Sequence, residues 1–156
     1  MSNAAATMVG QALGARDPER AERAVWRACL YNLAFLSAIG LAFVVFARPI
    51  VWAFTSDAQV LAYGTQCLRI VAAGFAFYAY GMVLSQAFNG AGDTTTPTLL
   101  NLVVFWIWEL PLAWALSVPF GMGPRGAFLA VAISFSTLAV AAGAIFRRGR
   151  WKQVVV

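Results

Sequence analysis

Four long apolar stretches, separated by short polar turns, follow one another along this chain. They cover residues 26–47, 66–88, 98–120 and 126–146. Each holds the roughly 20 mostly apolar residues that a helix needs to cross a hydrocarbon core of about 30 Å. A shorter apolar stretch at 1–13 has no basic region before it, so we interpret it as the tail of a truncated helix and not as a secretory signal. The pattern predicts an all-α integral membrane protein, with four complete transmembrane helices after a truncated one in a single membrane domain over 1–156.

The composition supports this class. Hydrophobic residues make up 62% of the chain and charged residues 11%, with a mean hydropathy of +0.75. Soluble domains are less apolar and more charged, so a lipid bilayer is the expected surrounding. Cys29 and Cys67 lack the spacing of metal ligands and there is no histidine, so no metal or cofactor is expected. No nucleotide-binding loop or catalytic triad pattern occurs, which argues against an enzyme.

Basic residues gather at one end of the predicted spans. Four precede the first span and four follow the last, namely Arg16, Arg20, Arg23, Arg27 and Arg147, Arg148, Arg150, Lys152. The connections on the other side hold only Arg48 and Arg125. Because positive residues favour the cytoplasm, segment 14–25, loop 89–97 and the tail 147–156 are predicted to be cytoplasmic. Topology explains the net charge of +5, and no nucleic-acid partner is expected.

A short internal repeat marks two of the cytoplasmic turns. The sequence GARD at 14–17 recurs as GAGD at 90–93, each time directly before a predicted helix. The candidate turn residues are Gly14, Asp17, Gly90, Gly92 and Asp93. A carboxylate at a helix N-terminus binds free N–H groups and the positive end of the dipole. Turn and cap chemistry is one interpretation, and a role in moving the helices during gating is the other.

Two more helix starts are predicted from capping patterns. Ser56 and Gln59 have the spacing of a capping box before the second span. Thr96 is expected to cap the third span, with Pro97 in its first position and the span starting near Thr98.

Two features of the spans predict packing. In the last span Gly126, Ala130, Ser134, Thr137 and Ala141 form a stripe of small residues at helical spacing, as expected of a helix–helix contact. Trp26, Trp52 and Trp151 fall near span boundaries, where amphipathic rings prefer to lie.

Several segments, taken in order, resemble the C-terminal lobe of the multidrug and toxic compound extrusion (MATE) family. They are SNAAATMVGQALGARDPERAERA (2–24), FTSDAQV (54–60), SQAFNGAGDTTTPTLLN (85–101), LPLAWAL (110–116), GPRGAFLAVAIS (123–134) and RRGRWK (147–152). The resemblance implies a part of a twelve-helix transporter built from two six-helix lobes, with the segments here similar to helix eight, truncated, through helix twelve. It implies export of organic cations by antiport with H⁺ or Na⁺ across the cell inner membrane. The missing N-terminal lobe is then expected in the same parent chain or in a partner chain.

Glu109 is the acidic residue deepest within a span, about 11 residues into 98–120. An unpaired carboxylate there is costly, so it should pair, reach water or hold a proton. A proton-holding acid could couple export to H⁺, and Pro111 is expected to loosen the helix beside it. A structural hydrogen bond or an ion pair with Arg69 is the alternative, and Arg69 could equally extend to the outer interface.

Other polar side chains could line a pathway or simply join helices. They include Tyr78, Gln86 and Asn101, together with Gln66, Tyr80 and Asn89. The helix that matches the family's tenth has no Asp or Glu between Asp57 and Asp93, so a coupling carboxylate cannot be carried over there and both H⁺ and Na⁺ fit. Three tryptophans beside Glu109 (Trp106, Trp108, Trp114) could stack on flat organic cations or face lipid.

Two further functions compete with drug export. The chain could be an assembly module that pairs with a partner lobe and does not transport alone. It could also belong to a lipid-linked glycan flippase of the wider superfamily, whose cavity would be expected to carry many basic residues, whereas Arg69 stands alone here.

Overall fold

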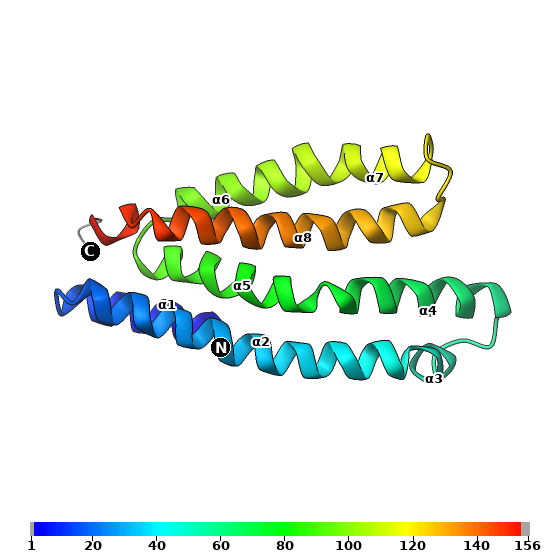
Figure 1. Cartoon of the computed structure of the whole chain (residues 1–156), viewed down its shortest axis with the longest axis horizontal. Helices are drawn as coiled ribbons and strands as arrows, with labels where there is room; N and C mark the ends of the chain where they lie inside the picture. The colour runs from blue at the N-terminus through cyan, green and yellow to red at the C-terminus, as the bar shows by residue number, and fades with distance from the viewer. Residues whose placement is uncertain (1, 154–156) are drawn as a thin grey trace.

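The structure, a computed structural model, describes residues 2–153 and is an elongated all-helical bundle (Figure 1). The predicted all-α class is confirmed. Its elements are α1 (Ser2–Gly14), α2 (Pro18–Val45), α3 (Ala47–Trp52), α4 (Ala58–Ala73), α5 (Phe75–Gly90), α6 (Thr95–Asn101), the π-helix η1 (Leu102–Glu109), α7 (Leu110–Ser117), α8 (Pro124–Arg147) and the 3₁₀-helix η2 (Arg150–Gln153).

Three helices are long and apolar enough to cross a membrane, and a bent pair makes a fourth candidate span. The three are α2, the continuous run Thr95–Ser117 and α8. The pair is α4 and α5, which meet at Gly74 with a bend of 54°. A Cβ on Gly74 would lie 3.5 Å from the Cβ of Ala132 on α8, so the bend sits where α8 packs closely. The sequence pattern did not predict this bend.

The observed helix caps confirm one of the helix starts predicted from the sequence and differ from the prediction at two others. Asp17 caps α2 and accepts a hydrogen bond from the Arg20 N–H at 2.9 Å. The predicted Ser56–Gln59 capping box is wrong, because Asp57 is the N-cap of α4 and its carboxylate accepts from the Gln59 N–H at 2.8 Å. A carboxylate is the stronger acceptor for these free N–H groups.

The start of the third span also differs from the prediction. The helix begins at Thr95, so Pro97 lies in its third position and not in its first. Thr96 does not cap it: the Asp93 carboxylate accepts from both the backbone N–H and the hydroxyl of Thr96, at 3.0 and 2.6 Å.

The best-buried core lies at the end of the bundle that carries the basic residues. Phe88 of α5, Phe146 of α8 and Trp151 of η2 are each 1% exposed, and they pack against Val9 of α1 and Val25 of α2. The Trp151 ring stacks on Phe146 at 4.6 Å, and its indole N–H donates to the Phe146 carbonyl. The Trp151 ring is thus part of this core, and its expected position near a membrane boundary stays a prediction.

The small-residue stripe on α8 is confirmed in its first half only. Gly126, Ala130 and Ser134 are buried, and a Cβ on Gly126 would lie 2.6 Å from the Leu116 carbonyl carbon. Beyond Ser134 the buried positions continue at a spacing of four, through Leu138 and Ala142. Thr137 and Ala141 lie off this line and face a groove instead.

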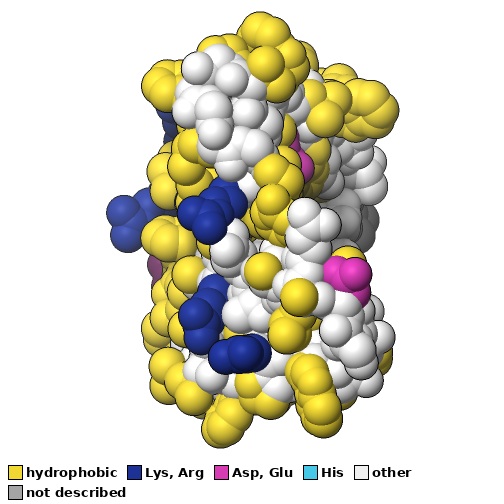
Figure 2. Space-filling model, turned by 90° about the vertical axis from the view of Figure 1, so that its right-hand side faces the viewer, with side chains coloured by type: hydrophobic (Ala, Val, Ile, Leu, Met, Phe, Trp, Pro, Cys, Tyr) yellow, Lys and Arg dark blue, Asp and Glu magenta, His cyan; other side chains and the backbone are white. Residues whose placement is uncertain are grey.

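Large apolar side chains are exposed around the bundle, as expected of surfaces in lipid. At the end that carries α3, hydrophobic atoms surround a few charged groups (Figure 2). Trp52 is 67% exposed and Phe54 87% exposed.

Candidate functional site in the membrane-spanning region

Glu109 lies where two helix types meet. It ends the π-helix η1 and immediately precedes α7, two residues before Pro111. Proline lacks an N–H and its ring clashes with the carbonyl four residues earlier, which a wider π-helical turn relieves. The loosening expected from Pro111 thus takes the form of a π-helix that ends at the acidic residue.

The neighbour of Glu109 is Ser134 on α8. This serine is fully buried, and its hydroxyl lies beside the Glu109 carboxyl. Neither the Glu109 Oε2 atom nor the Ser134 Oγ atom makes a well-formed hydrogen bond to any residue that the structure describes, although both atoms are buried. Unsatisfied buried polar atoms cost about 1–3 kcal/mol each. The contact between η1 and α8 therefore leaves one oxygen on each side without a hydrogen-bond partner among the described residues.

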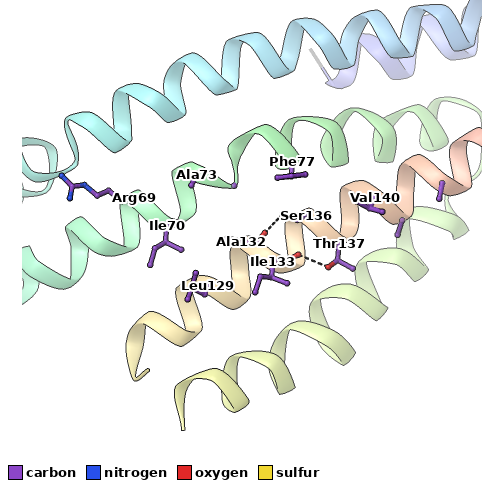
Figure 3. Close-up of a pocket in the computed structure, with 13 residues that line it drawn as sticks. Arg69, Ile70, Ala73, Phe77, Leu129, Ala132, Ile133, Ser136, Thr137 and Val140 are labelled. Carbon is purple, nitrogen blue, oxygen red and sulfur yellow. Dashed lines mark hydrogen bonds between the residues drawn. The ribbon is translucent and has the colours of Figure 1, made fainter. Parts of the chain in front are cut away.

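Arg69 does not partner Glu109. Its Nε donates to the Val44 carbonyl of α2 at 3.2 Å, and the side chain is exposed. Figure 3 shows its guanidinium extended away from α8. The ion pair considered from the sequence is therefore not formed, and the extended arrangement is found instead.

The remaining polar candidates are not brought to one place. The Tyr78 ring meets Phe135 of α8 edge-on at 4.8 Å. Gln86 accepts a hydrogen bond from its helix neighbour Asn89 at 3.3 Å, and Asn101 is exposed. These contacts are ordinary helix-surface and interhelical interactions.

A groove of about 830 Å³ runs between the α4–α5 bend and α8 (Figure 3). Its walls are almost entirely apolar, with Ile70, Phe77 and Ile133 among them. The hydroxyls of Ser136 and Thr137 also line it, but they donate to the carbonyls of Ala132 and Ile133 in their own helix. The groove therefore offers an apolar surface, with Arg69 as its charged residue.

Sequence reasoning missed two polar residues inside the bundle. Asn32 of α2 is 9% exposed, and its amide donates to the Ala79 carbonyl of α5 at 3.0 Å. Ser134 was assigned to packing alone. Their similar depth in the membrane could have indicated this contact. Ser134 lies eight residues from the outer end of its predicted span at 126, and Glu109 lies eleven residues from the outer end of its span at 120.

The turn residues of the internal repeat fall into two groups. Asp17 and Asp93 cap helices, as described above. Gly90 is a contact residue, because a Cβ there would lie 2.2 Å from the Ala6 carbonyl oxygen of α1. Gly14 has no such neighbour within 4 Å among the described residues, and Gly92 has a positive φ of 80° that suits a turn. Turn, cap and packing chemistry accounts for these contacts, and the gating role stays a prediction.

Comparisons with family models, related sequences and solved structures all point to the same family. The model of the MatE family matches residues 1–115. The chain is 34% identical over 154 residues to the probable multidrug resistance protein NorM of Caulobacter vibrioides, a match that covers 96% of this chain and 31% of the relative. It is 27% identical to Protein DETOXIFICATION 14 of Arabidopsis thaliana, covering 96% of this chain and 31% of that protein.

A solved structure shares the fold. It is an inward-facing multidrug resistance MATE family transporter of the MOP superfamily, with a TM-score of 0.88 and 21% sequence identity. The match covers 98% of this chain and 35% of the other. This chain thus spans about a third of the length of the relatives it matches. It belongs to the MATE family of multidrug membrane transporters, which are not enzymes.

Proposed function

We propose that this chain forms part of a secondary active exporter that moves organic cations and other amphipathic compounds in exchange for H⁺ or Na⁺. The observation that carries the proposal is the Glu109 carboxyl, which lies inside a candidate span and has a buried oxygen without a hydrogen-bond partner among residues 2–153.

A carboxyl at this position is suited to exchange. Ionised and unpaired it is costly in a membrane, so binding of a proton or of Na⁺ stabilises it. The neighbouring Ser134 hydroxyl can donate to an ionised carboxylate or offer its oxygen to a bound cation. The π-helix beside it is a backbone form frequently found at functional sites. Loss of the bound ion can in this way be coupled to movement of η1 against α8.

Alternating access requires two lobes that move about a central site, and the chain spans about a third of its relatives' length. We infer that transport needs the rest of a MATE-like protein, in the same parent chain or as a partner chain.

An assembly module without transport activity of its own is the second candidate, favoured by the long apolar groove beside α8. A flippase is disfavoured because Arg69, the basic residue of that groove, is directed to the Val44 carbonyl.

The basic end of the bundle is proposed to face the cytoplasm of a cell with this protein in its inner membrane. The clusters around Arg16–Arg27 and Arg147–Lys152 support this orientation by the positive-inside rule.

A chimaera tests the proposed transport. The region of the Caulobacter relative that matches this chain is replaced by it, and ethidium efflux is measured in energised membrane vesicles. The chimaera should export ethidium, and the chain alone should not. Efflux by the chain alone would contradict the need for a second lobe. A chimaera that is inserted and folded but inactive with ethidium and with other organic cations would contradict export and favour the assembly module.

A further inference from the structure

A second recess lies at the basic end of the bundle, between the α6–η1 run and the C-terminal tail. It has a volume of about 450 Å³. It is lined by the buried rings of Phe88 and Trp151, and Leu99 and Val103 of the α6–η1 run form its apolar wall. Arg148 and Arg150 line it from the tail. The recess is therefore amphipathic: apolar on the helix side and positively charged on the tail side.

Arg148 and Arg150 are the two basic residues of this tail without an ionic or cation–π partner among the described residues. Arg147 lies over the Trp26 ring at 5.8 Å, and Lys152 binds the Glu22 carboxylate at 2.5 Å. Arg148 and Arg150 form no ion pair with any described residue, and both are exposed. The other charged group that lines the recess is Asp93, whose two carboxylate oxygens already accept hydrogen bonds from Thr96.

The apolar wall continues along the membrane-spanning helix. Leu99 and Val103 line the recess itself, and Trp106 and Leu110 follow further along the same run, whose residues 102–109 form the π-helix η1. They are 54%, 50%, 68% and 56% exposed. These exposed apolar side chains, the Leu99–Leu110 track, therefore continue from the charged recess along the membrane-spanning run.

We propose that this recess binds an anionic phospholipid, with its phosphate at Arg148 and Arg150 and one acyl chain along the Leu99–Leu110 track. Arginine pairs with phosphate through two parallel N–H donors, and basic pockets at the ends of transmembrane helices are suited to acidic headgroups. A free phosphate would use the two arginines but not the apolar track. A neutral lipid would use the track but gain nothing from the unpaired charge. The inference stands apart from transport, because neither Glu109 nor Ser134 lines the recess.

The test is direct lipid binding by the full chain in detergent, followed by native mass spectrometry. Phosphatidylglycerol and phosphatidylcholine are titrated in parallel, with glycerol 3-phosphate as the soluble probe of the headgroup alone. Phosphatidylglycerol should bind at least about tenfold more tightly than phosphatidylcholine, since each basic residue near an acidic lipid contributes about 1 kcal/mol. It should also bind more tightly than glycerol 3-phosphate, which has no acyl chain to lie along the apolar track.

Variants separate this recess from general surface charge. R148Q/R150Q should weaken phosphatidylglycerol binding about tenfold, whereas R16Q/R20Q, which removes the same charge elsewhere at this end of the bundle, should change it less than twofold. L99W keeps both arginines but fills the apolar wall, and it should also weaken binding.

Three outcomes would overturn the proposal. An equal loss of phosphatidylglycerol affinity in R148Q/R150Q and in R16Q/R20Q would mean that the lipid responds to surface charge alone. Equal affinity for glycerol 3-phosphate would identify an anion site without a lipid. Unchanged binding in both R148Q/R150Q and L99W, in variants whose melting temperature matches the unmodified chain, would place the lipid elsewhere.

Discussion

Asp17 and Asp93 occupy the same position in two copies of one helix-to-helix turn. The backbone N–H of Asp17 donates to the Ala12 carbonyl at 2.9 Å, and that of Asp93 donates to the Phe88 carbonyl at 3.0 Å. Each Asp side chain then accepts from the N–H three residues further on, at 2.9 and 3.0 Å. The same hydrogen bonds thus end one helix and begin the next, so the GARD and GAGD repeat is a structural one.

The repeat predicts a stabilising change at Arg16. This residue has a φ of 56°, and its counterpart Gly92 has a φ of 80°. Non-glycine residues in this left-handed region are strained by roughly 1–2 kcal/mol. We expect Arg16→Gly to raise the free energy of unfolding by up to about 1 kcal/mol, part of the gain being offset by the greater freedom of glycine in the unfolded chain.

Thermal unfolding in detergent measures this effect. The control is Arg20→Gly, the same chemical change inside α2, which should lower stability by about 1 kcal/mol. A loss of stability in both variants would contradict the strained position of Arg16.

Gly90 is predicted to be intolerant of a side chain. A methyl group there would come within 2.2 Å of the Ala6 carbonyl oxygen, so α1 and α5 would have to separate. Gly90→Ala should lower the free energy of unfolding by about 1–3 kcal/mol. Gly14→Ala, at the matching position of the repeat, meets no described atom within 4 Å and should leave stability unchanged within about 0.5 kcal/mol. Similar melting temperatures for the two variants would show that the helices are not this close.

Trp151 is predicted to hold the tail against the bundle. Trp151→Ala removes a fully buried ring and should cost about 3 kcal/mol or more. Trp52→Ala is the matched control at the other end, because that ring is 67% exposed. Chemical unfolding in mixed micelles, combined with proteolysis at the tail, compares the two. Faster cleavage near Arg150 is expected in Trp151→Ala only, and resistance equal to that of the control would argue against a docked tail.

The contact between Glu22 and Lys152 predicts a pH-dependent contribution to stability. The hydrogen bond from Lys152 lowers the pKa of the Glu22 carboxyl below its usual value of about 4.3, helped by the Trp26 indole and opposed by partial burial. Because the pKa is lower in the folded state, the stabilisation is complete above the usual value and is lost as the pH falls through the lowered one. Both side chains are partly exposed, so we expect no more than about 1 kcal/mol.

The comparison of Glu22→Gln with the unmodified chain isolates this contribution from other titrating groups. The variant should melt at a lower temperature at pH 7, and the difference should shrink as the pH falls through the lowered pKa of Glu22. Glu19→Gln, in a more exposed pair with Arg23, is the control and should show a smaller difference at pH 7. A difference for Glu22→Gln that does not shrink on acidification would contradict the ionic origin.

Much of the fold could be predicted because apolar length is a strong signal. The long runs around 26–47, 98–120 and 126–146 are matched by α2, by the run Thr95–Ser117 and by α8. The bend at Gly74 could not be predicted, since it depends on where α8 packs.

The site was predicted less completely, because it depends on which helix faces which. Glu109 was found from its depth, whereas its neighbour Ser134 comes from a helix whose rotation the sequence does not define. The burial of Trp151 could not be predicted for the same reason, because the sequence does not show that the tail folds back onto Phe146.

Ion-coupled transport by the purified chimaera in proteoliposomes tests the central claim most directly. An outward-directed H⁺ or Na⁺ gradient is imposed, so that exit of the ion can drive entry of an organic cation, and uptake into the proteoliposomes is compared in the unmodified chimaera, in Glu109→Gln and in Glu19→Gln. The proposal predicts that the gradient accelerates transport in the unmodified protein and in Glu19→Gln, and that Glu109→Gln loses at least about 90% of this acceleration while keeping its substrate binding. Gradient-driven transport that is equal in all three proteins would contradict a coupling role for Glu109.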